Sequence, residues 1–288
     1  MITSRATSLF LALSLAACGG SSSGGAGTGR LEVDVTDAPI DVSLVDEAWI
    51  SVAEVRVLFE GDEDPGEDDE GFQTIFDGPS RQLNLLELNN GVVQRLVEAE
   101  LREGTIRQVR LVIDDAYLRL VNGNEYTTGD GSLHLTSQAT AGFKVFVEPP
   151  IEIERGFSRR MLLDFDLSKT FLPLPANDPL AAHTYNLLPV LHATNVDLTG
   201  EVRGLVFHVE DGDELGLDQA TVSLLPQGET NLDESVVGTF TDPDGSYALI
   251  GVLPGTYDVH ARHGASEARI DGVIVGVGDA ELVDVELP

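Results

Sequence analysis

Short segments in which apolar and polar residues alternate run through most of this chain, and they constrain its fold more than any other feature. Leu31, Val33 and Val35 alternate with polar residues, the period-two pattern of a strand with one buried face. Similar runs recur between turn residues, and residues 92–101 are the best candidate for a short helix. Many short strands with regular turns predict an all-β fold. Up to residue 192 the expected strands occupy residues 31–36, 49–59, 72–76, 82–88, 105–113, 116–121, 143–147, 151–154, 160–166 and 185–192.

A change of pattern at residues 195–200 indicates a junction between two domains. We expect two β-sandwich domains in tandem, the first at residues 30–196 and the second, with about seven strands, at residues 197–288. A chain of 288 residues, 42% of them hydrophobic, is long enough to build two such cores. The runs of the second domain occupy residues 202–209, 220–225, 236–240, 247–249, 257–261, 268–270, 273–275 and 282–287.

The N-terminus has the composition of an export signal. Arg5 is the only charged residue before an apolar run at residues 9–17, which is too short to span a bilayer but fits a secretory signal. The run ends in Leu15-Ala16-Ala17-Cys18, which resembles the bacterial lipobox. The resemblance implies a signal peptide at residues 1–17 and lipidation of Cys18. Because Gly19 is not an aspartate, the anchor is expected in the outer membrane if the cell has one. The alternative is an ordinary signal peptide cut near Ala17, with Cys18 incidental.

Two segments lack the apolar residues that a packed structure needs. Residues 18–29 are mostly glycine and serine, so they are expected to form a flexible tether behind the lipidated cysteine. Residues 60–71 read EGDEDPGEDDEG and are expected to be a solvated loop between two strands. A divalent-ion site is the alternative there, although flexible carboxylates bind ions weakly.

The charge balance limits the partners of the chain. Lysine and arginine number 17 against 49 aspartates and glutamates, a net charge of −32. Nucleic acid is therefore not an expected partner, since phosphate binding needs a basic patch. Anionic headgroups would also repel this surface, so membrane attachment is expected to come from the lipid.

Cys18 is the single cysteine, which excludes disulfides within the chain.

The second domain resembles the carboxypeptidase regulatory-like family. The matching segments are residues 200–204 (GEVRG), 220–224 (ATVSL), 241–247 (TDPDGSY) and 253–259 (LPGTYDV). The resemblance implies a transthyretin-like sandwich in which these residues are structural rather than catalytic. Gly245 would supply a permissive turn backbone, with Tyr247 packing inward just after it.

The first domain resembles a family described as domain of unknown function 4382. The matching segments, in the family's order, are residues 35–41 (VTDAPID), 83–91 (LNLLELNNG), 106–111 (IRQVRL), 142–144 (GFK) and 163–170 (LDFDLSKT). The resemblance implies an exported domain that commonly follows a lipobox. It implies no particular activity.

The sequence contains no recognisable catalytic constellation, neither a Gly-x-Ser-x-Gly elbow nor a His-Glu-x-x-His helix. Asp164 and Asp166 share one face of an expected strand whose other face is apolar. They are weak candidates for a Ca²⁺ site or an acid/base pair. The favoured interpretation is structural, with hydrogen bonds or charge supplied by Lys169, Arg159 or Arg160.

Two further patterns that could bind a metal have structural explanations. His260 and His263 lie three apart on an expected strand and so on opposite faces. Asp242-x-Asp244-Gly245 lacks the later ligands of a calcium loop and is interpreted as a turn. No metal or other cofactor is therefore expected, with Ca²⁺ as the open alternative, and the residues that bind a ligand are unknown.

The resulting functional hypothesis is a non-enzymatic lipoprotein, anchored in the cell envelope, with a binding or structural role. Its partner could be an envelope protein, a glycan or a peptide. The alternative is a hydrolase of extracellular polymers that uses the Asp164 and Asp166 carboxylates.

Overall fold

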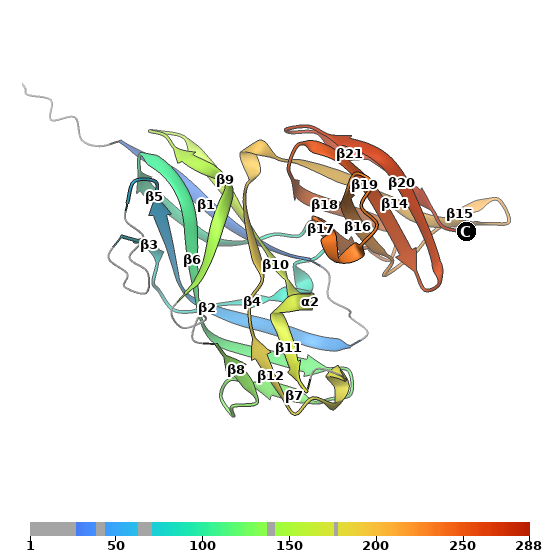
Figure 1. Ribbon diagram of the computed structural model, residues 1–288, viewed down its shortest axis with the longest axis horizontal. Coiled ribbons are helices and arrows are strands. Elements are labelled where there is room, and N and C mark those ends of the chain that lie inside the picture. The colour runs from blue at the N-terminus through green and yellow to red at the C-terminus, as the bar shows by residue number, and fades with distance from the viewer. Residues whose placement is uncertain (1–26, 39–43, 63–70, 137–141, 176–177) are drawn as a thin grey trace, which may run out of the picture.

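The computed structural model describes residues 27–38, 44–62, 71–136, 142–175 and 178–288 (Figure 1). Within these residues the chain is all-β and builds two cores, which confirms the predicted fold class. The first core draws its side chains from Leu31 to Ala193, and the second from Val202 to Leu287. Cys18 and the expected signal peptide lie outside the described residues. No helix in the described part of the chain is long and apolar enough to cross a membrane.

The first domain is built from one folded ten-stranded sheet. The strand order is β3-β2-β6-β9-β13-β10-β1-β5, with β4 and β7 paired to β2 and β6. Strand β9 joins the two layers of the sandwich, because it pairs with β6 along one edge and bridges to β13 through Val147 and Ala193. The strands are β1 (Thr28–Ala38), β2 (Val45–Phe59), β3 (Gln73–Phe76), β4 (Arg81–Asn84), β5 (Gln94–Arg102), β6 (Gly104–Leu120), β7 (Glu125–Thr127), β9 (Phe143–Ile153), β10 (Ser158–Asp166) and β13 (Leu191–Asn195).

Shorter elements complete this domain at one end. A three-stranded sheet of order β11-β12-β8 packs beside the main sheet, and one helical turn, α2, links β10 to β11. The bounds are β8 (Leu133–Leu135), α2 (Leu167–Thr170), β11 (Phe171–Leu174) and β12 (Thr184–Leu187), with 3₁₀ turns η1 (Leu85–Glu87) and η2 (Pro179–Ala181).

The helix expected at residues 92–101 is wrong, since this segment forms strand β5. Its Glu, Leu, Ala and Arg content suits a helix, but pairing with β1 along one edge of the sheet overrides that local preference. Leu96, Val97 and Leu101 are buried. The register of the β1–β5 pair shifts between Val33 and Asp34, where Leu96 of β5 has no partner in β1, and both Leu96 and Val97 are buried.

The expected tether extends two residues too far, because β1 begins at Thr28. Thr28 and Gly29 pair with Arg102 and Leu101 of β5. A Cβ at Gly29 would lie 2.4 Å from the carbonyl oxygen of Glu154. The glycine therefore serves close backbone packing at this position rather than flexibility.

The second domain is a sandwich of two sheets, coloured gold to red in Figure 1. One sheet has the order β15-β14-β18 with β21 and β22 on β14, and the other the order β17-β16-β19-β20. Strand β20 covers two expected runs, and the last expected run divides into β21 and β22. The bounds are β14 (Gly200–Glu210), β15 (Asp213–Gly216), β16 (Thr221–Pro226), η4 (Leu232–Glu234), β17 (Val237–Phe240), β18 (Ser246–Val252), β19 (Gly255–His263), β20 (Ser266–Val275), β21 (Ala280–Leu282) and β22 (Val285–Glu286).

The Asp242–Gly245 segment is a turn, as predicted. Gly245 N donates to Asp242 O at 2.8 Å, and Gly245 has a φ of +83°, which favours glycine. The Asp244 carboxylate accepts hydrogen bonds from the Ser246 hydroxyl and amide at 2.6 and 3.0 Å. These bonds hold the pKa of Asp244 below its usual value, the hydroxyl contributing most.

Candidate functional site

Asn90, in a turn of the first domain, is hydrogen-bonded to two strands of the second. Its Oδ1 accepts from Ala248 N at 2.6 Å, and its Nδ2 donates to Ser246 O at 3.3 Å. Its backbone N donates to Thr239 Oγ1 at 2.8 Å. Asn90 has a φ of +53°, a conformation that asparagine tolerates better than most residues. These contacts, together with the 3₁₀ turn η3 (Val196–Leu198) between β13 and β14, fix one domain against the other.

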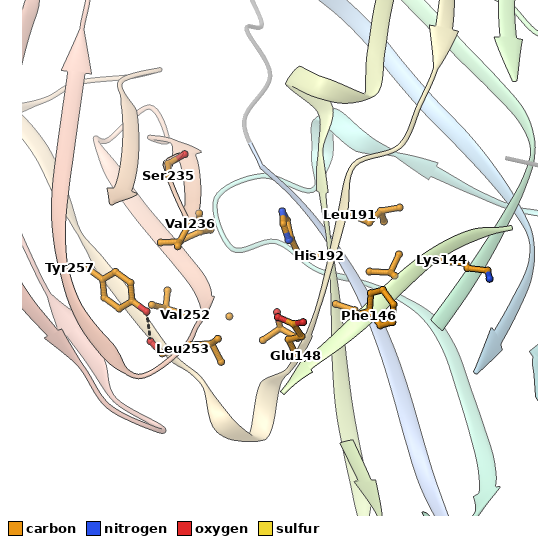
Figure 2. A pocket seen from close by; sticks show the side chains of 15 residues that line it. Lys144, Phe146, Glu148, Leu191, His192, Ser235, Val236, Val252, Leu253 and Tyr257 are labelled. Atoms are coloured by element: carbon orange, nitrogen blue, oxygen red, sulfur yellow. Dashed lines mark hydrogen bonds between the residues drawn. The ribbon is translucent and has the colours of Figure 1, made fainter. Parts of the chain in front are cut away.

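The two domains enclose a cleft of about 520 Å³ (Figure 2). On the first-domain side it is lined from β9 and β13, and on the second-domain side from the start of β17, the end of β18 and β19. Phe146 is 61% exposed, and Val236 and Leu253 are also exposed. Tyr257 donates from its hydroxyl to Leu253 O at 2.8 Å. Apolar side chains that are exposed in a concave surface are typical of a binding site.

A polar region of about 320 Å³ continues the cleft. It shares His192 and residues 235–237 with the apolar region. Asp164, Asp166 and Lys169 line its first-domain wall, and Ser223, Asp233, His260 and Arg262 are on the second-domain wall. The exposed apolar side chains thus gather at one end of the cleft, the apolar end, where Lys144 and Glu148 also line the wall, and most charged groups gather at the other. Both domains contribute to each end.

Asp166 is held by a charge partner within the first domain. Lys169 Nζ lies 2.9 Å from Asp166 Oδ2. The hydrogen bond to Asp166 is the largest influence that raises the pKa of Lys169, and the charges of Asp166, Asp233 and Glu234 raise it further. Asp233 and Glu234 belong to η4 of the second domain. Lys169 therefore also contributes electrostatically to the contact between the domains.

Asp164 differs from its neighbour. Its side chain is half-buried, and among the described residues its Oδ1 has no hydrogen-bond partner and no contact with solvent. Burial, followed by the charge of Asp166, raises the pKa of Asp164 to about 7. His192 is its register partner on β13, so the two side chains lie on the same face of the sheet. Because its pKa is near 7, the Asp164 carboxyl group in the wall of the cleft is partly protonated at neutral pH.

Among the described residues, two carboxylates that are more deeply buried than Asp164 have hydrogen-bond partners. Asp34 is 2% exposed and accepts from Arg95 Nε and, at 2.9 Å, from Arg160 Nη2. Asp258 is 1% exposed and accepts from Gly228 N, Gly272 N and Arg269. Such pairing is the usual condition of a buried carboxylate. Of Asp34, Asp164 and Asp258, only Asp164 has a buried oxygen without such a partner, and it is therefore the candidate for a functional role.

The predicted partners of the Asp164/Asp166 pair are correct in part. Lys169 does pair with Asp166, but Arg159 pairs with Glu154 and Arg160 with Asp34. Glu154 lies in the turn just before β10, and Asp34 lies on β1, which pairs with β10, so each arginine has another acid within reach. Asp164 and Asp166 share a face opposite the buried Met161, Leu163 and Phe165.

The residues that the sequence offered as possible metal ligands do not come together in the structure. His260 faces the polar end of the cleft, 3.5 Å from Glu267, whereas His263 is exposed at the end of β19. In the described part of the chain, no group of three or more histidines, cysteines or acids is arranged to hold a metal ion. Asp164 and Asp166 alone offer too few ligands for Ca²⁺, which takes six to eight oxygens.

The apolar end of the cleft was not predicted from the sequence. One local feature could have indicated it, because Phe146 stands with Lys144 and Glu148 on the polar face of strand β9. An apolar aromatic residue on the polar face of an alternating strand indicates a covered or ligand-binding position. Val236 and Leu253 have no such feature, because their approach to Phe146 depends on the arrangement of the two domains.

The fold and the cleft define a class of two-domain, all-β proteins in which the space between the domains is preformed. The chain belongs to the family described as Domain of unknown function (DUF4382), whose model matches residues 28–189. The model described as Carboxypeptidase regulatory-like domain matches residues 202–288. Both resemblances expected from the sequence, and their order, are thereby confirmed. No curated protein matches the chain.

Solved structures resemble the chain only weakly. The Bacillus anthracis TIE protein has 12% identity and a TM-score of 0.25, with 91% of this chain and 34% of that chain covered. This chain thus spans about a third of the length of that protein. The minor pilin GBS52 of Streptococcus agalactiae has 10% identity and a TM-score of 0.25, covering 89% and 94%. BcpA, the major pilin subunit of Bacillus cereus, has 9% identity and a TM-score of 0.24, covering 90% and 70%.

Proposed function

We propose that this protein is a non-enzymatic lipoprotein of the cell envelope that binds a ligand in the cleft between its two β domains. The observation that supports this most strongly is the exposure of Phe146, Val236 and Leu253 in a concavity to which both domains contribute. Asn90 holds the two walls in place before any ligand arrives. A preformed site loses less conformational entropy on binding than one that must be assembled.

The proposed location follows from the N-terminus. Lipidation of Cys18, with the glycine- and serine-rich segment behind it, would tether the two domains to the membrane, in the outer membrane for an organism that has one. Two or more acyl chains anchor a protein stably, since each buried CH₂ contributes about 0.8 kcal/mol. The net charge of −32 gives the protein surface no attraction of its own to anionic lipid.

A hydrolase that uses Asp164 and Asp166 is the less favoured function. A glycosidase places two carboxyl groups about 5–10 Å apart on either side of the bond it cleaves. Asp164 and Asp166 lie on one strand, and so on one wall of the cleft. Asp166 is also engaged by Lys169. The geometry suits recognition of a ligand better than cleavage across it.

The cleft can be tested with a charge placed in its apolar end. Phe146→Glu should abolish the binding of any ligand that occupies the cleft, because the new carboxylate would be desolvated by the ligand. The matched control is Leu215→Glu, at an exposed apolar residue of β15 outside the cleft. Binding of envelope peptides and glycans would be measured by calorimetry for the wild type and both variants. A ligand that binds all three proteins equally would contradict the proposed site.

A further inference from the structure

The first-domain wall of the cleft carries two carboxylates that lack a charge partner. Glu148 on β9 and Asp164 on β10 form no ion pair with the described residues. The strand between them, β13, contributes His192. Phe146 stands beside Glu148 on the same face of β9, as Figure 2 shows. This wall therefore presents two acids, with the exposed Phe146 ring beside Glu148 and His192 on the strand between them.

The basic groups near these acids are engaged elsewhere or face them from the other side. Lys169 is paired with Asp166, and Lys144 has an interaction partner of its own. Arg262 belongs to the second-domain wall. A positive group is thus missing on the first-domain wall, where Asp164 and Glu148 would receive it.

An unpartnered carboxylate oxygen that is shielded from water costs free energy. A cation at the side of Asp164 that faces the cleft would offset this cost, because charges attract strongly where solvent is largely excluded. Long-range attraction acts in the same direction. A net charge of −32 speeds the arrival of basic ligands and slows that of acidic ones.

We propose that the cleft binds a short basic peptide segment of a partner protein, with a lysine or arginine side chain against Asp164 and apolar side chains on Phe146, Val236 and Leu253. This inference rests on the proposed function and specifies its ligand. A polyamine would match the acids but leave the apolar end uncovered. A neutral sugar could stack on the exposed Phe146 ring but would offer no positive group to Asp164 and Glu148.

The test uses a short blocked peptide of alternating leucine and lysine, titrated into the mature two-domain protein by calorimetry. Asp164→Asn and Glu148→Gln should each weaken the affinity, the first by at least about tenfold. The matched controls are Asp213→Asn and Glu214→Gln, which neutralise exposed acids of β15. Thermal melts of every variant would verify that it is folded. Equal affinity for the wild type and Asp164→Asn would overturn the inference, as would failure of the peptide to bind.

Two further probes separate the parts of the proposal. A peptide of alternating leucine and glutamine should bind far more weakly than the lysine peptide, and so should spermine, which lacks the apolar groups. If the glutamine peptide binds as well as the lysine peptide and Phe146→Glu abolishes both, the cationic inference fails while the proposed site survives. If spermine binds as tightly as the lysine peptide, the peptide part of the inference fails.

Proton release gives a readout that a merely structural role for Asp164 would not affect. A bound cation would lower the pKa of Asp164 from about 7, so binding near neutral pH should release a fraction of a proton. Calorimetry in two buffers of different ionisation enthalpy measures this release, which should vanish in Asp164→Asn. The other charged or titratable groups facing the same space, which that variant retains, are Asp166, Lys169, His192, Asp233, His260 and Arg262. Unchanged proton release in Asp164→Asn would assign the proton to one of them and overturn this role for Asp164.

Discussion

The side-chain oxygen of Asn90 accepts a hydrogen bond from the backbone amide of Ala248 at 2.6 Å, across the boundary between the two domains. The amide end of the same side chain donates to Ser246 O, so Asn90 continues the hydrogen bonding of strand β18. Glycine follows at position 91, where a Cβ would lie 3.0 Å from the Ala248 Cβ. The close approach of the two domains is thus built on two adjacent residues with positive φ.

Replacing Asn90 should weaken the contact between the two domains. Asn90→Ala removes two hydrogen bonds across the boundary and places a residue with a Cβ but no polar group at a φ of +53°. We expect a loss of about 1–3 kcal/mol in the free energy of unfolding. Guanidinium denaturation followed by the fluorescence of Trp49, which reports on the first domain, would measure it.

Asn90→Gly is the matched control for backbone strain. Glycine accepts a positive φ without penalty, so this variant isolates the side-chain hydrogen bonds. Both variants should broaden the distribution of interdomain distances in solution scattering. If Asn90→Gly is as stable and as compact as the wild type, the side chain does not fix the domains.

Asp164 should make the stability of the first domain depend on pH. Its pKa is raised from 3.8 to about 7, so the folded state binds the proton more tightly than the unfolded state. The contribution of Asp164 to the stability is therefore most favourable below about pH 4. It falls as the pH rises and becomes constant above about pH 7. The full difference corresponds to at most about 4 kcal/mol, reduced by the part of the side chain that meets solvent.

Asp164→Asn should remove this pH dependence. The melting temperature of the variant should exceed that of the wild type at pH 8 and approach it at pH 4. The comparison between the two proteins isolates Asp164, since every other titrating group is common to both. Parallel melting curves from pH 4 to pH 8 would show that the Asp164 carboxyl titrates near its ordinary value.

The contribution of Asp258 to the stability of the second domain is expected to have the opposite pH dependence. Burial opposes its ionisation, but hydrogen bonds from Gly228 N, Gly272 N and Arg269 outweigh burial and lower its pKa below the ordinary 3.8. Its contribution is therefore present above about pH 4 and is lost as the pH falls through the pKa of the folded state. Asp258→Asn should cost about 3 kcal/mol at neutral pH, as measured by calorimetric unfolding. Asp271→Asn, which removes an exposed partner of the same Arg269, should cost less than about 1 kcal/mol.

Residues 197–288 should fold as an isolated domain. Every side chain of the second core lies within this segment, and its strands pair with one another. Loss of the contacts to Asn90 should lower the melting temperature relative to the same domain in the whole chain. A recombinant segment without a cooperative thermal transition would show that the first domain is required for folding.

Cys18→Ser should release the protein from the membrane. The acidic surface offers no other attraction to lipid, so attachment is expected to depend on the acylated thiol. Fractionation of cells that express the variant should find it outside the membrane pellet. A variant that stays in the pellet would contradict lipid anchoring as the means of attachment.

The strands and their buried faces could be predicted from the sequence because alternation is a local property. Met161, Leu163 and Phe165 are buried as their spacing requires, and Asp242–Gly245 forms the turn that its residues favour. Each of these features depends on neighbours within a few positions along the chain. The same holds for the segments that resemble the two families.

The features that depend on distant partners were decided only by the tertiary structure. Residues 94–102 form a strand because β1 offers them an edge with which to pair, against their own helical preference. Among the described residues Oδ1 of Asp164 has no hydrogen-bond partner, because Arg159 pairs with Glu154 in the turn before β10 and Arg160 pairs with Asp34 on β1. The cleft exists because Asn90 reaches a strand more than 150 residues away. No local pattern encodes such an approach, since its free energy comes from groups that meet only once the chain has folded.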